Sequence, residues 1–561
     1  MTQRTPLADR ARQRCTSRWL GVALAGLLAG AGLIGGQPAV AGDGQTGDRS
    51  ATPAVTAAVQ VTDNPRPSRA HSSPQLARNP TNGELVVVES EVRHDFGCVV
   101  HISSDGGRSW FRGGDIHEDP WTKCSQKPIN GPYATLTFDP DGVLYVAFYA
   151  NDPTYADDEF LPLHVFLARS EDGGRTFETN FVFEAPEPVT ENRGLHNNDR
   201  PMVAVDHSDP SNVYVAWMGR GGEDDDKPTK ALVAASHDGG RSFGEPVDVS
   251  DERGAYQPRP AVDPDGTLHV IFPIGLGAVP EGTDPFQVAR TVYHRRSADG
   301  GQTWSEPVQV DAGNASFFGG RKYVLAADQN DGTLYAAWYA HEDTHFDPAV
   351  EDVDIFLRSS TDGGQTWSER VTINDDANED RHINHYNPGV SIAPNGRVDV
   401  AWYDFRNSPY PERFPDGFSP PFNHDGFQDV YYSFSTDGGR TWAPNVRITD
   451  RIINREIGVW SNNVHSHMSV GIASSDDGAY VAWQDTRNGD RDLQAEDVYF
   501  ATARHERPAG AAGAAGAGTP NWALFAVGGA ALVLGMGLAM LIAWAVTRRG
   551  GVATANAPDR A

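Results

Sequence analysis

An octapeptide that recurs six times constrains the fold of this 561-residue chain more than any other feature. Its pattern is Ser-x-Asp-Gly-Gly-(Arg/Gln)-(Ser/Thr)-(Trp/Phe), and successive central aspartates lie 61 to 75 residues apart. Self-similarity at such a period is typical of one repetitive architecture rather than of several unrelated domains. The six central aspartates are Asp105, Asp172, Asp238, Asp299, Asp362 and Asp437.

Each residue type in the octapeptide has a mechanical role. The two glycines accept positive φ angles in a tight turn between strands. The Asp and Ser/Thr oxygens can accept backbone N–H groups inside that turn, and the final aromatic residue can pack between neighbouring sheets. Catalysis or metal binding is the alternative, but an active site needs one constellation and not six. We therefore expect these aspartates to be structural.

A second repeated element lies upstream of the octapeptides and has seven copies. It is a hairpin signal followed by an apolar strand, as in Asp331–Trp338 and Asn395–Trp402. The seventh unit has no octapeptide after its last strand, Asp497–Ala503. The segment Ala58–Asp63 matches the strands that follow the octapeptides, such as Val446–Asp450. We expect this N-terminal strand to complete the seventh sheet, because that closes a ring and removes a free edge.

These repeats predict an all-β fold, a seven-bladed β-propeller of four-stranded antiparallel blades over residues 55–505. The range gives about 64 residues per blade, more than the roughly 40–45 of a WD40 blade, so the loops carry the excess. The hairpins and octapeptides join strands one to two and three to four, which places both turns on one rim. The opposite rim carries the remaining loops and the connections between blades, and we expect function there.

The two ends of the chain predict export and a membrane anchor. Residues 1–41 hold five arginines, an apolar run and a small-residue site that ends at Ala41, which together predict a cleaved signal peptide; an uncleaved helix is the alternative. Residues 506–520 are Ala/Gly-rich and predict a stalk. Residues 521–547 are uncharged and long enough to cross a bilayer as a helix. Two arginines open the tail 548–561, which is therefore expected in the cytoplasm.

Charge and cysteine usage agree with an exported protein. The net charge is −29, and it is −35 between the two basic ends. Because that field repels phosphate, we exclude nucleic acid as a partner. Cys15 lies in the predicted signal, which leaves Cys98 and Cys124 as one pair. We expect a disulfide between them in an oxidising compartment, and two free thiols are the alternative.

The loop-rich rim is predicted to be rich in charged and polar residues. Several arginines there suit a carboxylate ligand, because guanidinium binds carboxylates bidentately. The candidate binding residues are Arg200, Arg259, Arg321, Arg406 and Arg487. Two of them belong to a repeated Asp-x-Arg element that begins at Asp404 and Asp485. The alternative for this element is an ion pair that pins neighbouring loops.

Histidines gather in the loops of the last three blades. They are His341, His345, His382, His385, His424, His465 and His467. A metal site with Asp404 or Asp485 is conceivable, but no pair has strict ligand spacing on a defined element. We expect solvated or hydrogen-bonded histidines, with neither a metal nor a cofactor.

The octapeptide is the Asp-box, or bacterial neuraminidase repeat, and over about residues 55–505 the chain resembles the sialidase superfamily of Asp-box propellers. The box is specific for this fold type but not for an activity, because it also occurs in receptors, assembly factors and other glycosidases. Sialidases have six blades, an arginine triad, a Tyr–Glu nucleophile pair and an Asp acid/base, and their first arginine lies in a Phe/Tyr-Arg-Ile-Pro motif.

This chain departs from that pattern. It has seven repeats, and it lacks the Phe/Tyr-Arg-Ile-Pro motif. The dipeptides Arg200-Pro201 and Arg259-Pro260 are only approximate matches to that motif. The triad and the Tyr–Glu pair are therefore not transferred. Asp95 lies in the loop between the second and third strands of the first blade, where the acid/base aspartate of a sialidase would lie.

Two functions follow from the resemblance and the predicted rim. The first is a membrane-anchored, cell-surface glycoside hydrolase resembling exo-α-sialidases, with carboxylates roughly 5–10 Å apart. Its candidate catalytic residues are Asp95, Asp404 and Asp485. The second is a non-catalytic binding or adhesion propeller for a cell-wall glycan or a protein partner, which needs only arginine, aromatic and amide groups. The missing motif favours the second.

Overall fold

The structure is a computed structural model. All described residues belong to the second of two compact units of the chain, Gly47–Ala561. The predicted signal peptide, stalk and anchor lie outside them, and within them no helix has the length and hydropathy of a membrane span. The described residues are 52–94, 97–116, 134–151, 163–185, 198–220, 229–251, 254–255, 257–274, 290–315, 323–341, 353–376, 383–409, 426–458 and 469–505.

Every regular element among these residues is a β-strand, and the strands form antiparallel sheets that we call blades 1 to 7. Blade 1 consists of β3 (His71–Arg78), β4 (Leu85–Glu91), β5 (Gly97–Ser103) and β6 (Phe111–Arg112). Blade 2 consists of β7 (Ala134–Phe138), β8 (Leu144–Asn151), β9 (Leu163–Ser170) and β10 (Glu178–Phe183). Blade 3 consists of β11 (Asn198–Val205), β12 (Val213–Arg220), β13 (Thr229–Ser236) and β14 (Val247–Asp248).

The next three blades repeat this order. Blade 4 consists of β15 (Arg259–Val262), β16 (Leu268–Ile274), β17 (Arg290–Ser297) and β18 (Val308–Ala315). Blade 5 consists of β19 (Val324–Ala327), β20 (Leu334–His341), β21 (Val353–Ser360) and β22 (Val371–Thr372). Blade 6 consists of β23 (His385–Ile392), β24 (Val398–Asp404), β25 (Phe427–Ser435) and β26 (Val446–Arg447), with β27 (Ile453–Asn454) also on β25. Blade 7 consists of β28 (Gly471–Ser475), β29 (Gly478–Asp485), β30 (Asp497–Arg504), β1 (Ala54–Val55) and β2 (Val59–Gln60).

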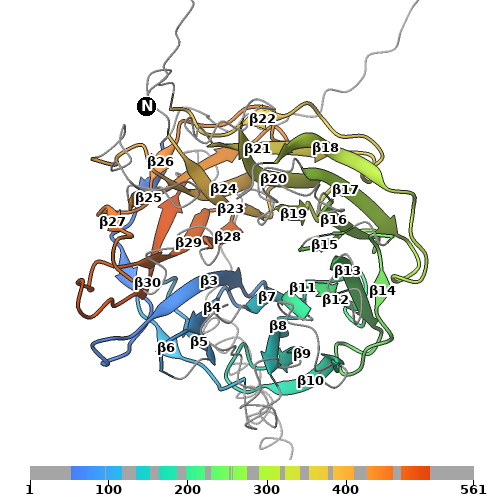
Figure 1. Cartoon of the computed structure of the whole chain (residues 1–561), viewed down its shortest axis with the longest axis horizontal. Coiled ribbons are helices and arrows are strands. Elements are labelled where there is room, and N and C mark those ends of the chain that lie inside the picture. Colours follow the sequence, from blue (N-terminus) through green and yellow to red (C-terminus); the bar gives the residue numbers. More distant parts are fainter. Residues whose placement is uncertain are drawn as a thin grey trace, which may run out of the picture. The chain divides into compact units, whose positions relative to one another are not determined.

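The seven blades form a closed ring around a common centre (Figure 1). The first strand of each blade contacts the first strand of the next, in the order β3, β7, β11, β15, β19, β23 and β28, and β28 contacts β3 again. This arrangement confirms the predicted seven-bladed propeller of four-stranded antiparallel blades.

The N-terminal strands close the ring, as predicted. β1 and β2 both pair antiparallel with β30, and Val59 lies opposite Phe500. The Thr62 hydroxyl donates to Asp497 Oδ1 over 3.1 Å, just as the Thr449 hydroxyl donates to Asp429 Oδ1 over 2.6 Å in blade 6. The closing segment therefore repeats the side-chain contact of an ordinary fourth strand.

The core lies between the blades. Four of the second strands carry tryptophans that are completely buried: Trp217, Trp338, Trp402 and Trp483. The aromatic residue of an Asp-box packs between its own blade and the preceding one, as Trp304 does among residues of blades 3 and 4. Because each blade buries both faces, its second strand is apolar on both faces, unlike the alternating pattern of a one-sided sheet.

The Asp-boxes and the hairpins between first and second strands share one rim, as predicted. Arg175 in the box of blade 2 forms a salt bridge of 2.7 Å with Glu84 in the hairpin of blade 1. Arg296 of blade 4 likewise donates to the carbonyl of Gly363 in the box of blade 5 over 3.1 Å. We call this the Asp-box rim and the opposite one the loop-rich rim.

Candidate functional site

The Asp-box carboxylates bond within their own turns. Asp105 Oδ1 accepts hydrogen bonds from the backbone N–H groups of Arg108 (2.9 Å) and Ser109 (3.0 Å), and Oδ2 accepts one from the Ser109 hydroxyl (2.6 Å). The Ser103 hydroxyl donates to Asp105 Oδ1 and accepts from Gly107 N–H. Gly107 can donate from this position because its φ is +87°, which suits glycine.

The other boxes repeat these bonds, and the bonds perturb the pKa of the carboxylates. The Ser109 hydroxyl and N–H lower the pKa of Asp105 to about 2, because they stabilise the charged form. The equivalent hydroxyls lower the pKa of Asp238 and Asp299 to about 2 as well. These carboxylates are satisfied locally and repeated around the ring, which fits the structural role expected for them.

The Asp404 carboxylate at the end of β24 is enclosed by its partners. The Trp402 indole N–H donates to Oδ2 over 2.9 Å, and the Arg406 guanidinium donates to both oxygens over 2.8–3.0 Å. Arg406 stacks 4.1 Å from the centre of the Tyr431 ring on β25. The Asn407 amide then bonds the Tyr431 hydroxyl over 2.8 Å, so loop and strand are held together.

The Asp485 carboxylate at the end of β29 has the same surroundings. The Trp483 indole donates to it over 3.0 Å and Arg487 over 2.7 Å. Arg487 stacks 4.1 Å from the centre of the Tyr499 ring, whose hydroxyl accepts from Asn488. The two side-chain carboxylates are 0% and 1% exposed in blades 6 and 7 respectively.

Each of these arginines also reaches back to the preceding blade. Arg406 pairs with Asp375 after the fourth strand of blade 5, over 2.8 Å, and Arg487 pairs with Asp450 after that of blade 6, over 2.8 Å. We call each set of contacts an Asp–Arg clasp. The geometry is that of the pinning alternative rather than of an arginine open to a ligand.

His385 at the start of β23 lies in a buried acidic environment next to the first clasp. Its Nδ1 bonds the Val353 carbonyl over 2.7 Å, and its Nε2 lies 3.0 Å from Asp376 Oδ1 and 3.4 Å from Asp404 Oδ2. Burial lowers the pKa of His385, but the charge of Asp404 and the hydrogen bond and charge of Asp376 outweigh it and raise the pKa to about 9. The imidazolium therefore links blades 5 and 6. In the described part of the chain, no group of three or more His, Cys, Asp or Glu could hold a metal ion.

Several predicted site residues lie outside the described residues. They are Asp95, Arg321, Cys124, His345, His382, His424, His465 and His467, and only the backbone of His341 is described. Cys98 on β5 is disulfide-bonded. Its pairing with Cys124 stays a prediction, as do the roles of the other residues.

Arg200 and Arg259 lie near the start of the first strands of blades 3 and 4, at the loop-rich rim. They are 8% and 4% exposed. Arg259 donates from Nε to the Tyr323 carbonyl over 2.7 Å and contacts the sulfur of Met202, so it bridges blades 3, 4 and 5. Arg200 Nε lies 3.5 Å from the carboxylate of Asp199. These two arginines thus lie on adjacent first strands, β11 and β15, whereas Arg406 and Arg487 belong to the clasps.

Sequence reasoning missed a distortion that recurs at this end of the first strands. Four residues there have positive φ although each precedes a proline, a combination that is sterically strained. They are Ser73 (53°), Arg200 (55°), Gln257 (30°) and Asn387 (58°). In blades 1, 3 and 6 the ladder shifts register at this point, which is a bulge that re-aims the side chain. The signal in the sequence is the X-Pro dipeptide that opens each of these strands.

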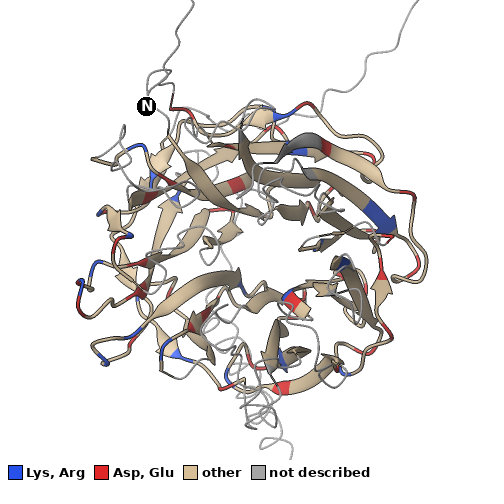
Figure 2. Ribbon diagram, in the orientation of Figure 1, with Lys and Arg blue, Asp and Glu red and all other residues tan. Residues whose placement is uncertain are grey.

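Asn387 is the most enclosed of these residues. It is 1% exposed, and among the described residues its amide nitrogen and oxygen have no hydrogen-bond partner. A buried amide without partners is costly, so such a group needs an explanation. Figure 2 shows both acidic (red) and basic (blue) residues spread around the ring.

Comparison with known proteins agrees with the repeats. The BNR repeat-like domain family matches residues 211–451, from just before the second strand of blade 3 to just after the fourth strand of blade 6. A sialidase of Micromonospora viridifaciens is 30% identical over 199 residues, which is 33% of this chain and 28% of the sialidase. This chain therefore matches less than a third of that relative's length.

Solved structures of low sequence identity also resemble the chain. An α-L-arabinanase of Penicillium chrysogenum is 14% identical, with a TM-score of 0.41, over 62% of this chain and 94% of its own. The Hadza microbial sialidase Hz136 is 15% identical, with a TM-score of 0.39, over 75% and 73% of the two chains. The six Asp-boxes, the closed ring of seven blades and the two sequence matches support the assignment of the chain as a sialidase-superfamily Asp-box β-propeller.

Proposed function

We propose that this chain is an exported propeller, anchored by its C-terminal helix, that acts on glycans at the loop-rich rim. The family match and the partial likeness to a sialidase support a glycan as the ligand. The signal, stalk and anchor patterns at the two ends support the surface location.

The arginine pair of blades 3 and 4 is the observation that carries the proposal. Arg200 and Arg259 come from neighbouring first strands, and the backbone and Met202 hold Arg259 in place. A guanidinium fixed in this way loses little entropy on binding, and it suits a carboxylate better than any other side chain does. An acidic sugar is therefore the ligand class. Asp199, beside Arg200, is a carboxylate at the same place that a hydrolase could use.

A specific observation supports binding without hydrolysis as the second candidate. The carboxylates of Asp404 and Asp485 are enclosed by tryptophan and arginine partners and do not face a substrate. Of the predicted catalytic residues, only Asp95 then stays as a candidate, and it lies outside the described residues.

Both candidates can be tested on the full chain in detergent. We expect binding to sialylated or uronate-containing glycans on an array, and Arg200→Ala and Arg259→Ala should each weaken it about tenfold or more. Arg241→Ala, an exposed box arginine of blade 3 on the opposite rim, is the control and should leave binding unchanged. Release of a fluorescent aglycone from a sialoside would assign hydrolysis, and its absence with binding intact would assign the second candidate. Binding that survives both arginine variants while they remain folded would refute the site.

A further inference from the structure

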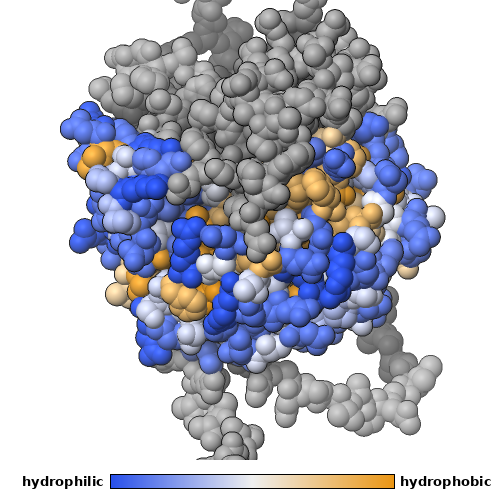
Figure 3. Space-filling model, turned by 90° about the horizontal axis from the view of Figure 1, so that it is seen from below, coloured by the Kyte–Doolittle hydropathy of each residue, from blue (hydrophilic) through white to orange (hydrophobic). Residues whose placement is uncertain are grey.

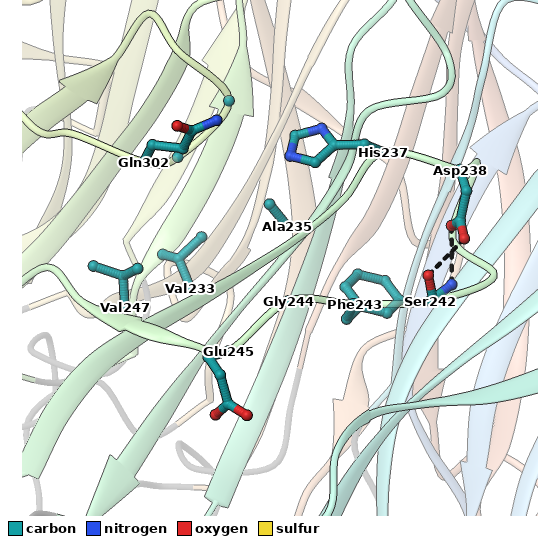
Figure 4. A pocket seen from close by; sticks show the side chains of 12 residues that line it. Val233, Ala235, His237, Asp238, Ser242, Phe243, Gly244, Glu245, Val247 and Gln302 are labelled. Carbon is teal, nitrogen blue, oxygen red and sulfur yellow. Dashed lines mark hydrogen bonds between the residues drawn. The ribbon is translucent and has the colours of Figure 1, made fainter.

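We propose that a groove on the Asp-box rim, between the boxes of blades 3 and 4, binds a short neutral saccharide. The groove has a volume of about 500 Å³. Its floor is formed by Val233, Ala235 and Val247, and Figure 4 shows these between His237 and Gln302 on one side and Glu245 on the other. It lies on the rim opposite the arginine pair, so it is a separate site.

The groove lies beside a short residue at a position that varies from blade to blade. Ala235 is the residue immediately before the box serine of blade 3, and the same position holds Arg169 in blade 2 and Arg296 in blade 4. Arg296 spans the gap to the next blade, where it donates to the Gly363 carbonyl over 3.1 Å. Ala235 is too short to reach the equivalent Gly300. The gap therefore stays open, and Val247 beside it is 37% exposed.

The lining matches the two faces of a sugar ring. A pyranose presents C–H groups that pack on an apolar floor, and hydroxyls that need donors and acceptors around it. Gln302 can donate and accept, and Glu245 accepts. The His237 Nδ1 lies 2.8 Å from Asn212 Oδ1, and this contact fixes the orientation of the imidazole ring. A few polar groups around an apolar floor is the general design of small-molecule sites.

Charge and size narrow the ligand class. Glu245 and the box carboxylate Asp238 line the groove, and the chain as a whole carries −29, so an anionic sugar is disfavoured. A volume near 500 Å³ lies in the lower half of the range of ligand sites, roughly 300–1,000 Å³, which suits one or two sugar units. Figure 3 shows that hydrophilic residues cover most of the described surface in that view, with apolar patches among them. The lining of the groove includes both hydrophilic and apolar residues.

Ala235→Arg tests the proposal without a change of fold, because blades 2 and 4 already hold arginine at this position. The matched control is Ser359→Arg, which makes the same change at the equivalent position of blade 5. The full chain in detergent is titrated with lactose, cellobiose and mannobiose by saturation-transfer NMR. We expect wild type and Ser359→Arg to bind, and Ala235→Arg and Glu245→Ala to bind about tenfold more weakly or not at all, with equal melting temperatures.

The outcomes separate this site from the arginine pair. Sialyllactose, which adds a carboxylate to lactose, should depend on Arg259 and not on Ala235. Unchanged affinity of Ala235→Arg for the neutral sugars would overturn the groove proposal, as would their loss in Arg259→Ala. Failure of all three disaccharides to bind, or a basic peptide occupying the groove instead, would also overturn it.

Discussion

At the residue scale, the clasps show how one carboxylate organises a blade. Asp404 and Asp485 each take an indole N–H from the strand and a guanidinium from the loop, and the guanidinium extends to a second carboxylate in the preceding blade. The charges are paired and hydrogen-bonded, as burial requires. The arginine therefore connects two neighbouring blades, and its removal should lower the free energy of unfolding.

Arg406→Ala should lower the free energy of unfolding by about 3 kcal/mol, because it leaves the buried Asp404 carboxylate without its cation. Urea denaturation followed by tryptophan fluorescence measures the change. Arg112→Ala is the control, since Arg112 pairs with Asp115 at an exposed site, where an ion pair contributes roughly 0–1 kcal/mol. Equal effects of the two substitutions would show that the clasp does not brace the ring.

His385 should make stability depend on pH. Its pKa is raised to about 9 in the folded protein, against about 6.5 when unfolded, so its stabilising contribution is fully present below pH 6.5 and is lost as pH rises through 9. His385→Gln should therefore destabilise the protein by up to about 3 kcal/mol at pH 6 and by much less near pH 9.5. Chemical denaturation of both proteins across this range gives the difference. A difference that is constant with pH would contradict the charged state assigned to His385.

At the element scale, the Asp-box is a turn whose side chains supply the bonds that its backbone lacks. The aspartate plays the part of an N-cap residue: one carboxylate collects two backbone N–H groups and a hydroxyl. Since the box sits between the third and fourth strands, its loss should loosen the outermost strand first.

Asp105→Ala should lower the free energy of unfolding by about 1 kcal/mol, as removal of a helix N-cap does, and should leave glycan binding unchanged. Denaturation and the glycan array on the same preparation measure both. Asp115→Ala, which removes an exposed carboxylate close by, serves as the control. Selective loss of binding in a stable Asp105→Ala protein would give the box a functional role.

Elements were predictable from the sequence to the extent that their determinants are local. The Ser-x-Asp-Gly-Gly turn holds its own bonds, so its copies revealed the blades, and the likeness of Ala58–Asp63 to Val446–Asp450 revealed the closure. The role of Arg406 stayed open because its partner Asp375 comes from the preceding blade and meets it only in the folded ring. The bulge at Asn387 was not predicted, because a proline near the start of a strand resembles a signal that interrupts the strand.

At the scale of the whole molecule, ring closure fixes where the chain leaves the propeller. β30 runs from the loop-rich rim to the Asp-box rim, and His505 N–H after it donates to the Asp477 carbonyl of the hairpin over 2.9 Å. β1 lies beside it, with Ala54 opposite Arg504. Both ends of the ring therefore lie at the Asp-box rim.

This exit point predicts how an anchored propeller would face. If residues 506–520 form the predicted stalk, these 15 residues would span on the order of 20 Å, so the Asp-box rim should stay near the membrane and the loop-rich rim should face outward. Arg491→Cys on the loop-rich rim and Arg108→Cys in the first box place one thiol on each exposed rim. On intact cells, a bulky maleimide should label the first several-fold faster, because the membrane hinders approach to the second. The two rates should become equal in detergent, and equal rates on cells would contradict an anchor at this end of the chain.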